Sequence, residues 1–289
     1  MKLFFLISLL AFSFLFVRNL SAQNEFHSPK NVKLFANYLF CEKDYLRASE
    51  EYQKLNDEYM DDTIAYKIIL SYSAIHNLDK ANELLKLINK NSIFYGESIL
   101  ESLKIQFLLN EKFNIENDES LNAALQDEKY HSAFLKLWFT SNLRYPLPGV
   151  IDSEENFLAV FEEPLKSEAK ELFYLRYYPD YKNPVTAGIL SALIPGAGKF
   201  YVNEIGDGVM ALLTTGIFAF LSYDNFRANH NFRGWLFAGI SSLFYAGNIY
   251  GSVAAAQISN SRVDYEFGVK LNSFLDDNKF FIPQINFCK

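Results

Sequence analysis

The sequence predicts an all-α protein in two parts: an exported domain of helical repeats, followed by a transmembrane helical hairpin that carries a re-entrant or interfacial helix. Three observations predict this fold: a helical pattern that repeats in the first half, a division of charge between the halves, and three apolar stretches in the second half. Of the 289 residues, 50% are hydrophobic and 21% are charged, which excludes a disordered chain. A length above the common ~100 to 200 residues of one domain favours two parts.

Residues 1–22 have the pattern of a secretory signal peptide. Lys2 precedes the uncharged run Leu3–Val17, and Ala22 offers a small residue where a signal peptidase would cut. The alternative is an uncleaved anchor helix, although the run is short against the ~20 residues that a membrane span needs. Either reading exports the residues that follow.

Between residues 31 and 89 the apolar residues recur with helical period, and the pattern occurs twice. Ala48 and Ala81 are 33 positions apart, and each follows a polar turn, at Lys43-Asp44 and at Asn77. This stretch resembles tetratricopeptide repeats, in which two antiparallel helices cross at a small residue. We expect such repeats over 23–150 and a helical connector over 151–182. A third copy is expected around Phe107, Lys112-Phe113 and Leu121.

The resemblance implies a protein partner that binds the concave face of the repeats. The alternative is that these helices form only a packed spacer. A series of tyrosines at helical spacing is more typical of a core than of a contact surface. Its members are Tyr38, Tyr45, Tyr52, Tyr59, Tyr66 and Tyr72.

Charge separates the two halves. Residues 23–182 hold 18 Lys and Arg against 27 Asp and Glu, whereas residues 183–289 hold seven of each. The whole chain has a formal net charge of -7 and no cluster of basic residues, so nucleic acid is excluded as a partner. The two cysteines form no disulfide framework, and we expect Cys41 to be a small buried apolar residue.

The second half reads as a membrane domain over 183–260, with spans at about 206–223 and 234–256 and a C-terminal tail over 261–289. The turn between the spans holds Arg227 and Arg233, which places it in the cytoplasm by the positive-inside tendency. Both outer ends then lie on the far side. We therefore expect a bacterial inner-membrane protein with its repeats and tail in the periplasm.

A third apolar stretch, 184–202, is interrupted by Pro195 and Gly196 and is expected to be re-entrant or interfacial rather than a span. A broken helix at membrane depth must be covered by protein or water, because lipid cannot satisfy the freed backbone groups. Small residues recur every fourth position in this stretch and in the last span, which predicts close packing of the two. These residues are Gly188, Ala192 and Gly196, and Gly247, Gly251 and Ala255.

Helix rise places several polar and turn residues together in the outer third of the bilayer, where polar groups within spans are functional candidates. We expect a binding site there, formed by Pro195, Gly196, Gly198, Lys199, Tyr201, Asp207, Asn248 and Tyr250. The structural alternative is that Asp207 caps its helix and that Asn248 makes one interhelical hydrogen bond.

Three separated motifs in 184–260 resemble a family of small bacterial membrane domains that are often fused to helical repeats. They are the turn Pro195-Gly196-Ala197-Gly198-Lys199-Phe200-Tyr201, then Gly206-Asp207-Gly208, then Gly247-Asn248-Ile249-Tyr250-Gly251. Lys199 departs from the expected Gln. The resemblance implies no established activity.

Neither catalytic nor metal-binding patterns appear in the sequence. The four histidines are scattered, and the Gly196-to-Lys199 segment lacks both the first Gly and the Ser or Thr of a phosphate loop. We therefore expect a non-enzymatic adaptor without cofactor, which binds a protein through the repeats and is anchored in the inner membrane. The alternative is that the membrane domain is the active part, binding lipid or assisting a membrane complex, with the repeats as a docking module.

Overall fold

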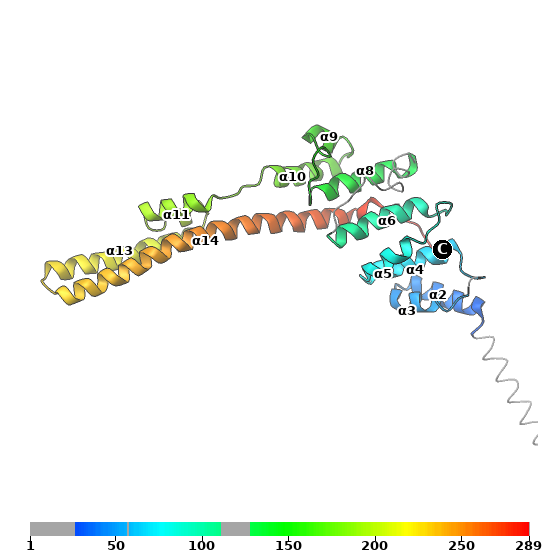
Figure 1. The fold of residues 1–289 in the computed structure, drawn as a ribbon, viewed down its shortest axis with the longest axis horizontal. Coiled ribbons are helices and arrows are strands. Elements are labelled where there is room, and N and C mark those ends of the chain that lie inside the picture. Colours follow the sequence, from blue (N-terminus) through cyan, green and yellow to red (C-terminus); the bar gives the residue numbers. More distant parts are fainter. Residues whose placement is uncertain (1–26, 57, 111–127, 289) are drawn as a thin grey trace, which may run out of the picture. The chain divides into compact units, whose positions relative to one another are not determined.

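The computed structural model describes residues 27–56, 58–110 and 128–288, and within these ranges it is all-α and contains no strand (Figure 1). The expected fold class is thereby confirmed at the level of all-α architecture. The expected signal peptide over 1–22 lies outside the described residues. The chain forms two compact units, and the second is inserted in the first: unit 1 comprises residues up to Phe161 together with Leu275–Lys289, and unit 2 comprises Glu162–Phe274.

Most helices of unit 1 come in sequential pairs. The helical elements of unit 1 are α2 (Pro29–Cys41), α3 (Tyr45–Tyr52), α4 (Asp62–Ala74), α5 (Leu78–Leu85), α6 (Tyr95–Leu108), α8 (Glu128–Asn142), α9 (Glu154–Leu158) and the 3-10 turn η1 (Lys279–Phe281).

The pairs α2–α3 and α4–α5 are built alike. Each pair turns at a residue with positive φ, Lys43 at 63° and His76 at 59°. The next side chain then accepts a hydrogen bond at the start of the second helix: Asp44 from the amide of Arg47, and Asn77 from the amide of Lys80, both at 3.4 Å.

The two alanines of the repeated pattern, Ala48 and Ala81, are completely buried. The same turn conformation recurs after α6, at Asn110 with φ 59°. Of the third expected copy, Phe107 is buried in α6, whereas Lys112-Phe113 and Leu121 lie outside the described residues.

The tyrosine series divides between core and surface. Tyr52 and Tyr66 are buried, and the Tyr52 hydroxyl donates to Oδ1 of Asn37 at 2.7 Å. Tyr38 is 60% exposed, and the remaining three are half-buried. The three half-buried tyrosines pack against the buried cluster of this unit, so the series is a core feature except at Tyr38.

The expectation for the cysteines was wrong. Cys41 is exposed at the end of α2 and is joined by a disulfide bond to Cys288. The two residues are 247 positions apart, so no local spacing reports the bond. It forms because the C-terminal segment belongs to unit 1.

The C-terminal residues are not a separate tail. Helix α14 (Asn231–Asp277) continues without interruption across position 260, and the residues from Leu275 onward are part of unit 1. Phe280 is buried there, and its ring lies 6.0 Å from that of Phe107.

Unit 2 consists of a helical hairpin with another helical segment of the chain beside it (Figure 1). Its elements are α10 (Leu165–Tyr177), α11 (Pro184–Leu193), α12 (Ala197–Tyr201), α13 (Ile205–Arg227) and the part of α14 up to Phe274.

Helices α13 and α14 are antiparallel and are joined by a short turn. The Ser222 hydroxyl donates to the carbonyl of Gly234 at 2.9 Å, and the Ser241 hydroxyl to that of Thr215 at 3.2 Å. The rings of Phe218 and Phe244 stack 5.3 Å apart.

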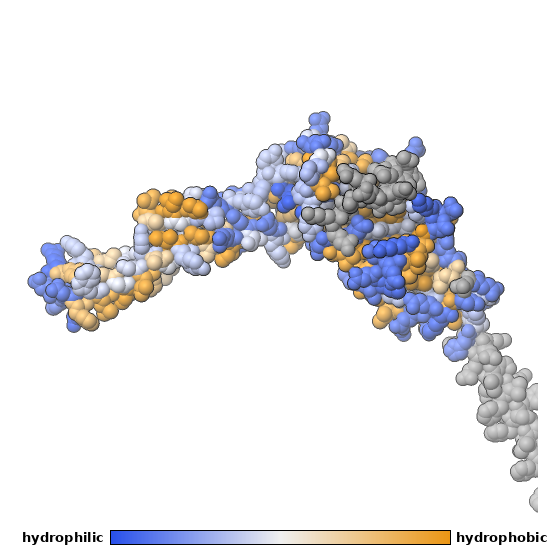
Figure 2. Space-filling model, viewed as in Figure 1, coloured by the Kyte–Doolittle hydropathy of each residue, from blue (hydrophilic) through white to orange (hydrophobic). Residues whose placement is uncertain are grey.

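Helix α13 is long and apolar enough to cross a membrane, and it is the one such helix by length and composition in the described ranges. Only 11% of its most apolar 18-residue stretch is buried within the protein. Figure 2 shows apolar side chains gathered at the surface over α11 and along the hairpin. The second expected span, 234–256, lies within α14.

Replacing Ala81 by Leu tests the helix crossing in the second pair. Because Ala81 is completely buried, we expect overpacking to lower the free energy of unfolding by about 1 to 3 kcal/mol. Hydrogen exchange of the α4 and α5 amides in the full chain measures this loss. Ala74→Leu is the matched control, since Ala74 is exposed in α4. Equal exchange in the two variants would contradict the crossing.

Candidate functional site

The interruption between α11 and α12 frees backbone groups in a predictable way. In a continuous helix the carbonyl of Ser191 would accept from residue 195, and that of Ala192 from residue 196. Pro195 has no N–H to donate. Ile194 is extended, with φ -135° and ψ 116°, which takes the chain out of the helix and turns the N–H of Gly196 away from Ala192. Gly196 then adopts φ 87° ahead of α12.

Two side chains of α14 take over these freed groups. The Asn248 amide nitrogen donates to the carbonyl of Ser191 at 3.3 Å, and its Oδ1 accepts the N–H of Gly196 at 3.1 Å. The Tyr245 hydroxyl donates to the carbonyl of Ala192 at 2.5 Å. Asn248 is 5% exposed, so it serves as a buried replacement for the amide that Pro195 lacks.

Two buried serines extend this network. The hydroxyls of Ser191 and Ser252 lie 2.6 Å apart, and Ser191 Oγ also accepts the N–H of Gly198 at 2.9 Å. Every partner comes from α11, α12, the break between them or α14. The network therefore fixes the broken segment onto α14.

Glycine is required at both ends of α12's first turn. A Cβ at Gly198 would lie 1.9 Å from the carbonyl oxygen of Ala187, and one at Gly196 would lie 2.2 Å from that of Gly208. Both contacts are with backbone atoms, which cannot move aside as a flexible side chain can. Gly198 thus lets α12 approach α11, and Gly196 lets the break approach α13.

The small-residue stripe predicted on the last span contacts the broken segment only in part, since Ala255 packs against the buried cluster of Ala187, Val202 and Ala256. An added Cβ at Gly247 would meet nothing within 4 Å, and one at Gly251 would meet only the Lys199 side chain, at 3.6 Å. Helix α14 bonds to 181–198 through polar side chains: Tyr245, Asn248 and Ser252 at the break, and Asn260 and Asp264 just before α11. The reason is that the freed backbone groups need hydrogen-bonding partners, which glycine side chains do not supply. Gly188 does pack closely, since its Cβ would lie 2.9 Å from Val253.

Lys199 and Asp207 form an ion pair at the edge of the network, with 3.3 Å between Nζ and Oδ2. The Lys199 side chain is 18% exposed and the Asp207 side chain 70%. Both line a cavity of about 480 Å³ between α13 and α14. Its other lining residues are mostly apolar: Met210, Ala211, Thr214, Ile240, Leu243, Phe244, Gly247 and Asn248.

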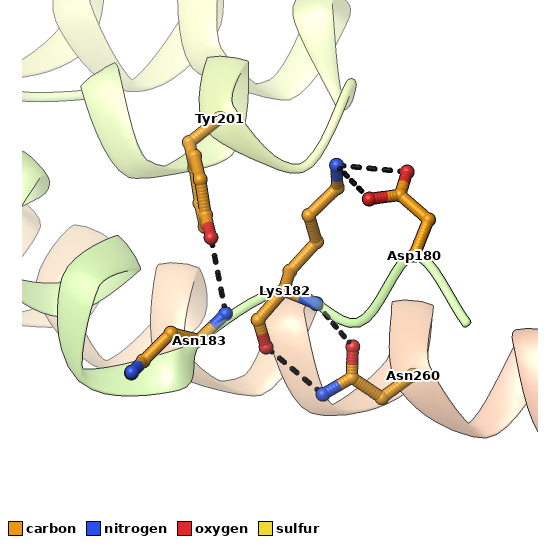
Figure 3. Close-up of polar contacts among 5 residues, drawn as sticks. All are labelled: Asp180, Lys182, Asn183, Tyr201 and Asn260. Atoms are coloured by element: carbon orange, nitrogen blue, oxygen red, sulfur yellow. Dashed lines mark hydrogen bonds and ion pairs between the residues drawn. The ribbon is translucent and has the colours of Figure 1, made fainter. Parts of the chain in front are cut away.

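A second group of contacts holds the start of α11 (Figure 3). The Asn260 side chain bonds both backbone groups of Lys182, accepting its N–H at 2.7 Å and donating to its carbonyl at 2.9 Å. The N–H of Asn183 donates to the Tyr201 hydroxyl at 3.1 Å, and Asn183 itself caps α11. Tyr201 therefore supports the entry to α11 and does not bond at the break.

The expected site residues thus separate into three groups and one isolated residue, Tyr250. Pro195, Gly196, Gly198 and Asn248 meet at the break, and Lys199 with Asp207 lies beside it. Tyr201 bonds to the start of α11. Tyr250 is 76% exposed and faces away from the break.

Sequence reasoning missed Ser191, Tyr245, Ser252 and Asn260. A signal for two of them was present, because positions 245 and 252 lie three and four residues from Asn248, on the same face of one helix.

Within the residues that the structure places, no group of three or more His, Cys, Asp or Glu side chains could hold a metal ion.

No known family model, curated protein or solved structure matches this chain. What the site offers chemically is a satisfied polar cluster and an ion pair beside an apolar cavity.

Replacing Asn248 by Leu leaves the carbonyl of Ser191 and the N–H of Gly196 without partners. An interhelical hydrogen bond in a membrane is worth about 0.6 to 2 kcal/mol, so we expect the Gly196 amide to exchange roughly 3 to 30 times faster. Hydrogen exchange of the 191–198 segment in detergent micelles measures this rate. Tyr250→Leu should leave it unchanged, because Tyr250 is exposed on the same helix. Unchanged exchange in the Asn248 variant would show that the bonds contribute nothing.

Proposed function

We propose that this chain is a non-enzymatic envelope protein, anchored in the inner membrane by the α13–α14 hairpin, whose exported unit 1 binds a protein partner. The observation that carries the proposal is the exposure of α13. Val209, Met210 and Leu212, which project in different directions around that helix, are each at least 41% exposed. An apolar surface of this kind around a long helix is expected in lipid rather than in water.

The insertion of unit 2 into unit 1 supports two spans. Because unit 1 is assembled from chain on both sides of unit 2, residues 161 and 275 must lie on the same side of the membrane. The chain between them must then cross the membrane an even number of times. If α13 crosses once, the N-terminal half of α14 supplies the return, and α11 with α12 does not span.

The disulfide supports the assignment of sides. Disulfide bonds persist in oxidising compartments such as the periplasm, and Cys41–Cys288 lies in unit 1. The hairpin turn holds Arg227 and Arg233, which favour the cytoplasmic side. Two independent features thus point to the same orientation.

The paired helices of unit 1 support protein binding. Stacked pairs of this kind create extended surfaces that many repeat proteins use to bind a partner. The resemblance of this stretch to tetratricopeptide repeats points the same way, and the 33-residue spacing of the positive-φ turns and buried alanines agrees with it.

The cavity between α13 and α14 favours a second candidate, in which the membrane domain binds lipid and unit 1 is a docking module. Its apolar walls match an acyl chain, and Lys199 at its edge matches an anionic headgroup. Asp207 already neutralises Lys199 in part, which weakens this candidate.

Single cysteines test the topology. Ala228→Cys in the hairpin turn should resist a membrane-impermeant maleimide in intact spheroplasts, whereas Ala74→Cys in unit 1 should react. Both positions are exposed, and the native cysteines are held in a disulfide that does not react with maleimide. Labelling of both positions, or of Ala228→Cys alone, would contradict the proposed orientation.

Photoreactive amino acids placed on exposed residues distinguish the two candidates. Tyr38 on α2 reports on unit 1, and Leu213 on α13, which is 50% exposed, reports on the hairpin. An adaptor should crosslink from position 38 to one discrete protein band in living cells, and Lys199→Met should not remove it. A band that is absent from position 38, together with a single lipid species captured from 213 in a Lys199-dependent way, would favour the second candidate.

A further inference from the structure

The C-terminal segment 279–288 lies on the surface formed by three helices of unit 1. Its Phe287 contacts Phe40 of α2, Tyr66 of α4 and Phe94 at the start of α6, with ring centroids 5.8 to 6.3 Å apart. At the other end of the segment, Phe280 packs on Phe107 of α6. Because residues 282–288 form neither helix nor strand, this segment lies across the helices as an unstructured peptide ligand would.

Phe287 covers a buried cation. The ammonium of Lys67 lies 5.3 Å from the centre of the Phe287 ring and 5.4 Å from that of Phe40. It donates to Oδ1 of Asn37 at 2.6 Å, and burial lowers its pKa. The aromatic ring of the segment is thus a specific partner of this surface.

The entry of the segment is strained. Lys279, Phe280 and Phe281 are consecutive non-glycine residues with φ of 48°, 53° and 58°. Left-handed backbone is unfavourable for bulky residues, and runs of it are rare. Strain of this kind persists where the surrounding structure holds the chain in place, and it gathers at ligand clamps and switches.

The segment also fills the surface incompletely. A cavity of about 330 Å³ remains between it and the helices, lined by Tyr66, Leu70, Glu101 and Lys104 on one side and by Ile282, Ile285 and Phe287 on the other. This cavity is open to solvent on one side, so part of the surface of the helices beside the segment stays accessible. What fastens the far end is the disulfide from Cys288 to Cys41, and both cysteines are exposed to a reductant.

We propose that segment 279–288 is a displaceable internal ligand, and that reduction of Cys41–Cys288 opens this surface to a partner peptide of the same kind. That peptide carries two aromatic side chains seven positions apart, to occupy the places of Phe280 and Phe287. The inference rests on the proposed function, because it names the surface of unit 1 that binds protein.

The chemical step is thiol–disulfide exchange with a dithiol protein. One thiolate of the dithiol attacks a sulfur of the Cys41–Cys288 bond and forms a mixed disulfide, releasing the other cysteine as a thiolate that takes up a proton. The second thiol of the dithiol then displaces the remaining cysteine. The S–S bond of this protein is reduced by two electrons, and the dithiol is oxidised to a disulfide.

A labelled synthetic peptide of residues 278–287, which contains no cysteine, tests the proposal by fluorescence polarisation against the full chain in detergent micelles. We expect no saturable binding to the oxidised protein. After reduction the peptide should bind saturably but weakly, because the segment is then held at one end only and still competes at an effective concentration in the mM range. A second protein, Cys288→Ser with Phe287→Ala, removes the tether and weakens the competitor, and it should bind the peptide at least tenfold more tightly than the oxidised wild type.

Controls make the outcome decisive. A peptide in which both phenylalanines at 280 and 287 are replaced by alanine should not bind the variant, and far-UV circular dichroism should show unchanged helix content. Equal binding to oxidised and variant proteins, or no binding to a folded variant, would overturn the proposal. A protein crosslinked from Tyr38 equally well before and after reduction would leave the proposed function standing and remove this inference.

Discussion

The fold of unit 2 depends on one missing group, the backbone amide hydrogen that Pro195 cannot supply. Its absence ends α11, and it leaves the carbonyls of Ser191 and Ala192 and the N–H of Gly196 without helical partners. Each of these groups is then bonded by a side chain of α14, from Asn248 or Tyr245. A buried backbone group without a partner is costly in protein and more so in lipid, so the break and α14 form together.

The core of unit 1 is completed in a different way, by a segment from the C-terminal end of the chain. Its paired helices need stacked neighbours to bury their apolar faces. The chain returns after α14 to supply one more covering element, in which Phe280 is buried. The disulfide then joins the last turn of α2 to the end of this segment. Since the inserted unit begins and ends in unit 1, its hairpin must return to the side from which it starts, whatever the partner of unit 1 is.

The candidate site shows which contacts local sequence patterns can predict and which they cannot. Pro195, Gly196 and Asn248 could be placed near one another from helix rise alone, since depth along a helix follows from residue number. The face of α14 that meets them could not, because a small-residue stripe and a polar stripe coexist on that helix. The polar residues make the hydrogen bonds at the break because freed backbone groups need donors and acceptors. Of the small residues, Gly247 has empty space beside it, whereas Ala255 packs on the cluster that contains Ala187. Tyr250, two positions beyond Asn248, projects from another side of the helix because a helix has about 3.6 residues per turn, and it is exposed.

The sequence by itself determined the helices, their repeated turns at Lys43 and His76, and the break at Pro195, because each depends on residues within a few positions of one another. Only the tertiary structure decided that Cys41 pairs with Cys288, that the C-terminal segment returns to unit 1, and that Asn248 serves the break. These contacts join residues 52 to 247 positions apart. No periodicity specifies them, because they arise when distant groups satisfy one another's hydrogen bonds and apolar surface in the folded chain.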